Sequence, residues 1–160
     1  MRLSFRTAED NELEFCEFVN RQNMSGYLAA RGIPWDSDRF RASWMEFENL
    51  MILAESEAVG LLRLAPEKAA LGLRDLQVSL SHQGRGIGSW AILQTLIIAA
   101  DRGFRRVQLR VYEENPAKAL YSRLGFRTEA IVDGTAHMAW VLPPNQSFNP
   151  TPSARLNSSS

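Results

Sequence analysis

The chain has 160 residues, which is enough for one domain with a substantial core and too few for two comfortable ones. Its 18 basic and 18 acidic residues cancel, so we expect neither nucleic acid nor a membrane among its partners. The single cysteine, Cys16, excludes an intramolecular disulfide, and no apolar stretch resembles a signal peptide or reaches the ~20 residues of a membrane span. The composition therefore indicates a cytoplasmic protein.

The first part of the chain predicts one strand followed by two helices. Residues 3–6 form a short strand, and apolar residues at helical spacing then predict a helix that runs to about Met24 and is stopped by Gly26. The stretch 26–35 is irregular but too apolar for a simple linker. A second helix is expected over residues 36–49, where apolar side chains recur at i, i+4 and i+7: Phe40, Trp44 and Phe47.

The remainder predicts short strands around two further helices. The strands are β-branched or apolar runs, and each helix is followed by a glycine. The strands are expected at residues 50–54, 59–65, 73–78, 107–111, 127–132 and 137–142, and the helices at residues 87–102 and 116–124. The predicted order is therefore β-α-α-β-β-β-α-β-α-β-β, an α/β domain over residues 1–143. From residue 144 onward the composition shifts to proline, asparagine, serine and threonine, which predicts a polar, flexible tail over residues 144–160.

A glycine-rich turn, Gln83-Gly84-Arg85-Gly86-Ile87-Gly88-Ser89, joins the strand 73–78 to the helix 87–102. The backbone N–H groups of such a turn and the positive end of the helix converge on one point and favour an anion there, above all a phosphate. A P-loop is excluded, because no lysine occurs between Lys68 and Lys118. A dinucleotide fingerprint is excluded too, because the third glycine is misplaced. Glycines that serve only the backbone of the turn are the alternative.

A second motif follows the predicted strand 107–111. It reads Asn115-Pro116-Ala117-Lys118-Ala119-Leu120-Tyr121-Ser122-Arg123-Leu124-Gly125-Phe126, with asparagine as a helix N-cap, proline at the first helical position and glycine after the helix. Together with Gln83-x-x-Gly86-x-Gly88, it resembles the signatures of the GCN5-related N-acetyltransferases. The resemblance covers residues 3–142. It implies a mixed, mostly antiparallel sheet with helices on both faces, acetyl-CoA as co-substrate and no metal.

The resemblance also implies roles for individual residues. The glycine-rich turn would hold the pyrophosphate of the coenzyme, and the backbone at the end of the preceding strand would pair with its pantetheine arm. The residues implied in coenzyme binding are Leu76, Gln77, Val78, Gln83, Gly84, Arg85, Gly86, Ile87, Gly88, Ser89 and Asn115. Tyr121 matches the family's proton donor to the departing thiolate, while its place in an apolar helical stripe also fits a core residue.

The proton acceptor is less clearly marked in the sequence. Arg110 stands where some relatives carry a glutamate, and an arginine cannot act as a base. Asp75 is the one carboxylate on the predicted strand 73–78 and is therefore the candidate base. The alternatives are an ordered water and an amine that arrives already neutral.

The resemblance thus predicts an acetyl-CoA-dependent N-acetyltransferase that acts on a primary amine of a small molecule or a peptide by direct transfer in a ternary complex. Tyr27, Trp35 and Asp36, between the first two helices, and the last hairpin would wall the acceptor site. Two other classes stay open: a non-catalytic acyl-CoA-binding module and a generic nucleotide-binding domain. We expect a monomer or a homodimer.

Overall fold

A seven-stranded sheet with the strand order β1-β2-β3-β4-β5-β7-β6 forms the centre of the structure. The computed structural model describes residues 1–143, so the predicted tail lies outside the described residues. The strands are β1 (Leu3–Thr7), β2 (Glu48–Ala54), β3 (Glu57–Glu67), β4 (Ala70–Val78), β5 (Arg106–Tyr112), β6 (Arg127–Val132) and β7 (Thr135–Val141). The helices are α1 (Leu13–Ala29), α2 (Ser37–Glu46), α3 (Ile87–Asp101) and α4 (Ala117–Arg123), with short 3₁₀ turns at Asp10–Glu12 and Leu80–His82. The predicted element order is confirmed.

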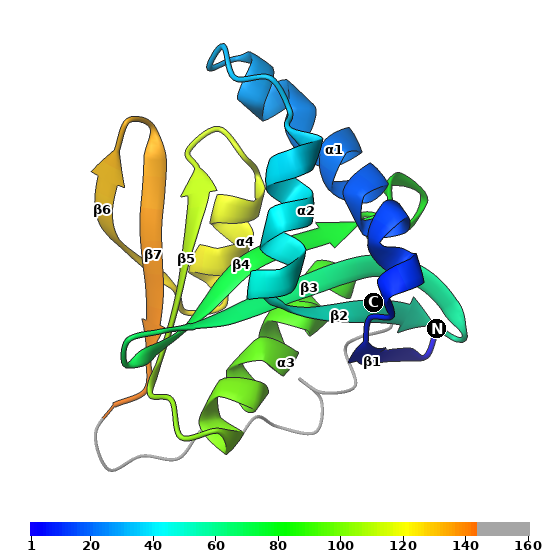
Figure 1. Cartoon of the computed structure of the whole chain (residues 1–160). Coiled ribbons are helices and arrows are strands. Elements are labelled where there is room, and N and C mark those ends of the chain that lie inside the picture. Colours follow the sequence, from blue (N-terminus) through cyan, green and yellow to red (C-terminus); the bar gives the residue numbers. More distant parts are fainter. Residues whose placement is uncertain (144–160) are drawn as a thin grey trace.

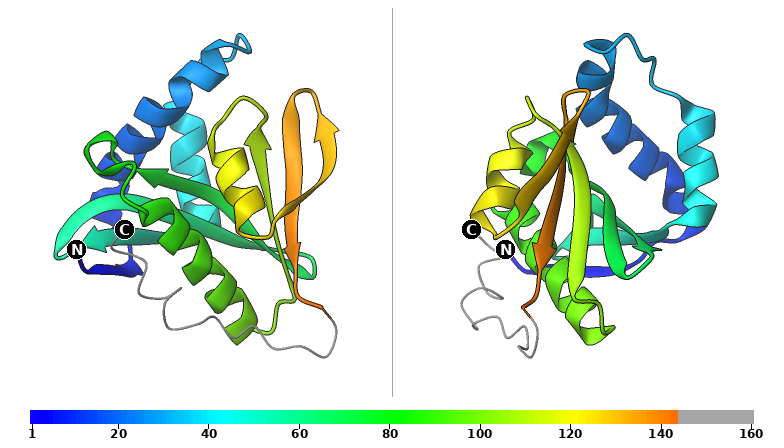
Figure 2. Two further views of the ribbon diagram at one scale, coloured as in Figure 1. Left: turned by 180° about the vertical axis from the view of Figure 1, so that it is seen from behind. Right: turned by 90° about the vertical axis from the view of Figure 1, so that its left-hand side faces the viewer.

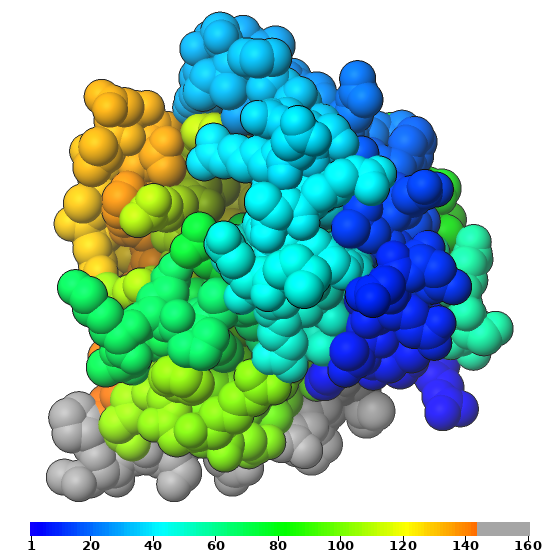
Figure 3. Space-filling model, viewed as in Figure 1, coloured from blue at the N-terminus to red at the C-terminus, as the bar shows by residue number. Residues whose placement is uncertain are grey.

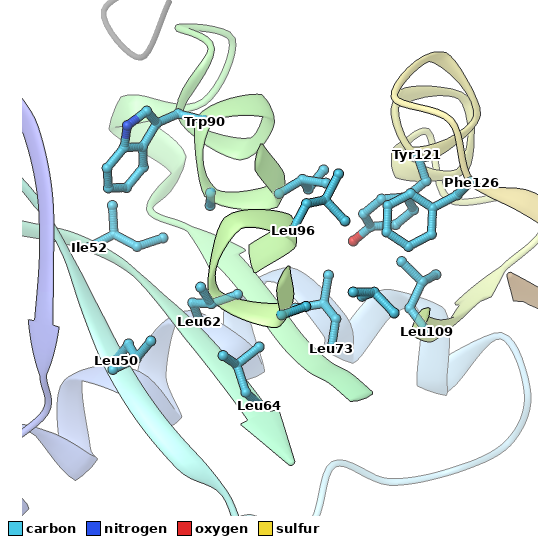
Figure 4. Packing of buried hydrophobic residues seen from close by; sticks show 14 of the residues in the cluster. Leu50, Ile52, Leu62, Leu64, Leu73, Trp90, Leu96, Leu109, Tyr121 and Phe126 are labelled. Atoms are coloured by element: carbon cyan, nitrogen blue, oxygen red, sulfur yellow. The ribbon is translucent and has the colours of Figure 1, made fainter. Parts of the chain in front are cut away.

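The helices cover both faces of the sheet, α1 and α2 on one face and α3 and α4 on the other (Figures 1 and 2). The larger core lies under α3 and α4, where the apolar residues of α3 meet alternate residues of the strands. Figure 4 shows this packing through ten labelled side chains, Leu50, Ile52, Leu62, Leu64, Leu73, Trp90, Leu96, Leu109, Tyr121 and Phe126. A smaller core under α1 and α2 contains Cys16, Val19, Phe40, Trp44, Met51 and Leu61.

The first helix is longer than the sequence predicts. It passes through Gly26 and ends at Ala29, because the residue that closes it is Gly32, with φ +69°. The N–H groups of Gly32 and Ile33 bond back to the carbonyls of Ala29 and Leu28 at 3.0 Å each, which is the pattern of a Schellman cap. A glycine inside a helix costs only about 1 kcal/mol relative to alanine, so Gly26 does not by itself end α1.

The second helix is shorter than predicted, ending at Glu46 and not at Asn49. Glu48 and Asn49 instead begin β2, where they pair with Leu64 and Arg63 of β3. The expected turn of residues 55–58 also shrinks, because β3 already begins at Glu57. Pairing with a neighbouring strand outweighs the helical spacing at residues 47–49.

Strand β4 carries the irregularity that shapes the site. Its register against β3 shifts between the pairs Leu64–Leu73 and Arg63–Asp75, so Arg74 is an extra, bulged residue. The bulge lets Leu73 and Leu76 face the same core although they are three positions apart, and it turns Asp75 toward α1. The strand ends at Val78, as predicted.

The strands β4 and β5 are the only parallel neighbours among the described strands, and they pair at Leu71–Val107 and Gly72–Gln108. Beyond these positions they diverge, while β4 stays paired with β3 up to the contact between Val78 and Gly60. Figure 1 shows the two arrows separating. The end of β4 therefore presents a backbone edge that none of the described strands covers.

Candidate active site

A cleft of about 1030 Å³ opens where β4 and β5 separate. Figure 3 shows a hollow between the β6–β7 hairpin (orange) and the helices α1 and α2 (blue to cyan), with β5 (yellow-green) in its floor. The predicted site residues that line the cleft are Asp75, Leu76, Gln77, Val78, Gln83, Gly84, Gly86, Ile87, Gly88, Ser89, Asn115 and Tyr121. The exception is Arg85, which is exposed and does not line it.

The glycine-rich turn forms one wall of the cleft. Gly84 and Gly86 adopt φ values of +75° and +81°, a conformation that residues with a side chain rarely adopt. Gly86 accepts the first backbone hydrogen bond of α3, from Trp90 at 3.0 Å. Within the described part of the chain, the N–H groups of Ile87, Gly88 and Ser89 bond no backbone carbonyl, as at any helix start. These donors and the helix dipole favour an anion at this end of the cleft.

The side chain of Gln83 ties this turn to β4. Its amide nitrogen donates to the carbonyl oxygen of Val78 at 3.0 Å. The same carbonyl accepts a hydrogen bond from the side chain of Asn23 in α1, also at 3.0 Å, and Asn23 donates to Gln77 as well. Asn23 is not among the residues predicted to form the site. The signal that could have indicated it is a pair of polar residues, Asn20 and Asn23, one helical turn apart on an otherwise apolar face.

Asn115 and Tyr121 line the cleft from the α4 side. The side-chain oxygen of Asn115 accepts a hydrogen bond from the N–H of Ala117 at 3.0 Å, so it caps the start of α4 as predicted, although α4 begins at Ala117 and Pro116 takes the N-cap position. The ring of Tyr121 lies 5.8 Å from that of Phe126, and Figure 4 shows its hydroxyl directed from α4 toward the sheet. This hydroxyl bonds no residue in the range 1–143. Burial, and to a smaller extent the charge of Asp75, raise the pKa of Tyr121 above its ordinary value.

Asp75 belongs to a buried polar network on the other face of the sheet. Its carboxylate accepts hydrogen bonds from Asn20 at 2.7 Å and Gln77 at 2.9 Å, and lies 3.5 Å from the guanidinium of Arg63. Arg63 is 3% exposed and its guanidinium donates hydrogen bonds to the side-chain oxygens of Asn49 and Ser43. The guanidinium also lies over the ring of Phe40. Burial raises the pKa of the Asp75 carboxyl, while the hydrogen bonds and the charge of Arg63 act in the opposite direction.

The residues expected at the acceptor end are only partly brought together. Tyr27 lines the cleft, with its ring 6.1 Å from that of Tyr112. Trp35 does not line it; its indole N–H donates to Asn20 at 2.9 Å, and its ring packs against Phe40. Asp36 does not line it either and caps α2 by accepting the N–H of Arg39.

The end of α1 is held against the opposite wall of the cleft. The guanidinium of Arg31 lies 3.6 Å from the ring centre of Tyr112, pairs with Glu114 and donates to the carbonyl of Gly134 in the β6–β7 turn. These contacts bridge the cleft at the end where the acceptor is predicted to bind. The helix α1 and the last hairpin are therefore joined here, as walls of one site.

A helix start that favours an anion, a strand that opens from its parallel neighbour and a tyrosine between them form the arrangement that the two motifs predict in an α/β fold. The model of the acetyltransferase (GNAT) family matches residues 12–126, so the chain belongs to this family. The resemblance predicted from the two motifs is thereby confirmed. In residues 1–143 no helix is long and apolar enough to cross a membrane, and no cluster of three or more His, Cys, Asp or Glu side chains has metal-binding geometry.

Solved structures share the fold. The PaiA N-acetyltransferase of Thermoplasma acidophilum, solved with coenzyme A, is 19% identical with a TM-score of 0.70, covering 88% of this chain and 99% of that chain. The ribosomal-protein-S18-alanine N-acetyltransferase of Escherichia coli is 18% identical (TM-score 0.69, covering 92% and 100%). An acetyltransferase of Thermus thermophilus is 25% identical (TM-score 0.69, covering 89% and 98%). No curated protein matched the sequence.

Proposed function

We propose that the protein is an acetyl-CoA-dependent N-acetyltransferase that acts on a primary amine of a small molecule or a peptide. The observation that carries the proposal is the opening between β4 and β5, which has an anion-binding helix start at one side and Tyr121 within it. A cytoplasmic location and a monomeric or homodimeric state stay predictions.

The coenzyme fits the opening in two ways. Its pyrophosphate matches the N–H groups of Ile87, Gly88 and Ser89, which no backbone carbonyl in residues 1–143 satisfies. Its pantetheine arm contains amide groups, and these match the backbone edge of residues 76–78, which β5 leaves uncovered and where, within the described chain, only the Val78 carbonyl is already bonded, by Asn23 and Gln83. We propose no separate phosphate contact for Arg85, since its side chain lies outside the cleft.

The chemistry requires two proton movements. A neutral amine nitrogen forms a bond to the acetyl carbon, the carbon–sulfur bond breaks, the amine loses a proton and the departing thiolate gains one. Tyr121 is the proposed donor to the thiolate, because its hydroxyl is protonated at neutral pH and has no protein partner among the described residues.

Asp75 is the proposed proton acceptor. An ionised carboxylate offers about four acceptor positions, and Asn20, Gln77 and Arg63 use three, so one position is left for the amine or for a bridging water. Burial raises its pKa toward the range in which a carboxylate is a useful base. The same contacts also fit the second candidate function, a non-catalytic acyl-CoA-binding module, in which Asp75 only stabilises the fold.

The two functions differ in one measurable property, the release of free CoA that depends on an added amine. We expect a panel of amines, amino acids and short peptides to include acceptors that raise thiol release above the slow hydrolysis of acetyl-CoA. The protein's own thiol does not disturb this assay, because Cys16 is 1% exposed and burial raises its pKa to about 12. Tight acetyl-CoA binding without amine-dependent release would establish the binding module instead.

The coenzyme site is tested by a matched pair of glycine variants. Gly86→Val and Gly103→Val place the same side chain at φ +81° and +85°, at the start and after the end of α3, so both carry similar backbone strain. Only the first lies in the cleft. We expect calorimetric affinity for acetyl-CoA to fall severely for Gly86→Val and to stay near the parental value for Gly103→Val. Equal affinities of the two variants for acetyl-CoA would refute the assignment of the pyrophosphate site to this turn.

A further inference from the structure

Arg110 is a cationic side chain in the cleft that the proposed chemistry does not use. It lies in β5, lines the cleft and is exposed. Among residues 1–143 it has no ion pair, hydrogen bond or ring contact. Two other cleft charges are balanced, since Arg74 pairs with Glu67 and Asp75 with Arg63. Arg123 also lines the cleft without an ion pair among the described residues, but it belongs to α4 on the other face of the sheet. Arg110 therefore leaves a positive charge without a partner in the cleft wall.

The alternation of β5 places Arg110 on the acceptor side of the sheet. Val107, Leu109 and Val111 point into the core under α3 and α4, so Arg110 and Tyr112 face the other way. Tyr112 meets Tyr27 of α1, and Arg31 just beyond the end of α1, on that side. The proposed phosphate site at the start of α3 lies across the sheet, so Arg110 is not placed to bind the coenzyme's pyrophosphate.

The surroundings of Arg110 favour an anion over a cation. Its register partner on β7 is His137, and directly opposed residues of antiparallel strands share a face, so a second nitrogen-bearing side chain lies beside it. Asp75 is the one carboxylate among the described residues that line the cleft, and Arg63 already balances its charge. A polyamine or a lysine-rich peptide would meet uncompensated positive charge here.

We propose that Arg110 binds a carboxylate of the acceptor, so that the substrate class is an amine that carries a carboxylate, as an amino acid or an acidic peptide N-terminus does. The guanidinium presents paired N–H donors that match the two oxygens of a carboxylate. This proposal rests on the proposed function for its catalytic meaning. The carboxylate site itself is also open to a direct binding measurement.

The experiment compares acceptors that differ in one carboxylate. Free amino acids and their amides form one set, and peptides that begin with Asp or with Asn form a second, which separates a small-molecule from a peptide acceptor. The preference for carboxylate over carboxamide in kcat/KM is measured for the parent, Arg110→Gln, Arg110→Lys and a control, Arg127→Gln. Arg127 is an exposed strand arginine outside the cleft. The same acceptors are used throughout, so differences in intrinsic amine reactivity cancel.

We expect Arg110→Gln to lower the carboxylate preference by about 10- to 100-fold, the range of one hydrogen bond to a charged group, with acetyl-CoA affinity unchanged. Arg110→Lys should retain part of the preference, and Arg127→Gln all of it. A parent without a carboxylate preference, or an Arg110→Gln variant that keeps it, would overturn the proposal. So would a loss of acetyl-CoA affinity in Arg110→Gln, which would assign the arginine to the coenzyme.

A second measurement keeps this inference separate from catalysis. N-acetylated amino acids and their amides are titrated into the CoA-loaded protein by calorimetry. Binding that prefers the carboxylate and depends on Arg110, in a protein that transfers no acetyl group, would support the anion site and refute the proposed function. Turnover of amines without any preference for a carboxylate would support the proposed function and refute the anion site.

Discussion

Replacing Tyr121 with phenylalanine removes a single oxygen atom from the cleft. The ring is 8% exposed and packs against Phe126, and phenylalanine keeps these contacts. The hydroxyl bonds no side chain or backbone group in residues 1–143, so its removal leaves no buried protein group unpaired. We therefore expect the free energy of unfolding to change by less than about 1 kcal/mol, and acetyl-CoA to bind as before.

The catalytic effect should be much larger than the effect on stability. If the hydroxyl protonates the departing thiolate, kcat should fall by about 10²- to 10⁴-fold, with little change in KM. Steady-state thiol release at saturating acetyl-CoA and amine measures this fall. Because burial raises the pKa of Tyr121, the hydroxyl stays protonated beyond its ordinary value of ~10. The parental kcat should therefore show no decline from this group below about pH 10.

The leaving group supplies a sharper control. A thioester whose thiol is more acidic needs less help from a proton donor. Tyr121→Phe should therefore lose less activity with such a thioester than with acetyl-CoA. A purely structural tyrosine would give the same loss with both. A variant with the parental kcat, or a loss that does not depend on the leaving thiol, would show that the donor lies elsewhere.

Two further predictions concern the buried pair. Asp75→Asn should lower kcat and shift the rise of the pH–rate profile to a higher pH, because the parent gains activity as Asp75 loses its proton. The variant should become active only where the amine is neutral without a base. An unchanged pH–rate profile would favour a water relay or an amine that arrives neutral. Arg63→Met should lower the free energy of unfolding by about 3–5 kcal/mol in urea, since it leaves Asp75 buried without a counter-charge. The double variant Arg63→Met/Asp75→Leu should recover most of this loss. Equal stabilities of the single and the double variant would contradict the pairing.

The features that sequence reasoning recovered are those encoded by neighbouring residues. Glycines at positive φ, the cap of α4 and the periodicity of the apolar runs each act within a few positions, so Gly86, Asn115 and the order of elements along the chain were predictable. The end of α1 was not. Both Gly26 and Gly32 could end a helix as far as the sequence shows. Only the hydrogen bonds from the N–H groups after Arg31 to the carbonyls of Leu28 and Ala29 identify Gly32 as the residue that closes α1.

The features it missed depend on contacts between distant parts of the chain. Asn20 and Asn23 reach β4 from α1 across 55 positions, and no local pattern predicts this contact. The bulge at Arg74 exists only relative to β3, and it turns Asp75 toward Arg63, 12 positions earlier in the chain. A candidate base could be named from the sequence, but not the three donors that surround it.

The geometry of the cleft also bears on the order of the chemistry. A covalent acetyl-enzyme needs a reactive nucleophile, and the chain's one thiol, Cys16, is buried on the inner face of α1, where burial raises its pKa to about 12. The cleft is lined from both faces of the sheet, by the start of α3 on one side and by Tyr27, Arg110 and Tyr112 on the other. Coenzyme and acceptor can therefore be bound together and meet where β4 leaves β5. Both sides belong to one cleft, and this is why we propose direct transfer in a ternary complex.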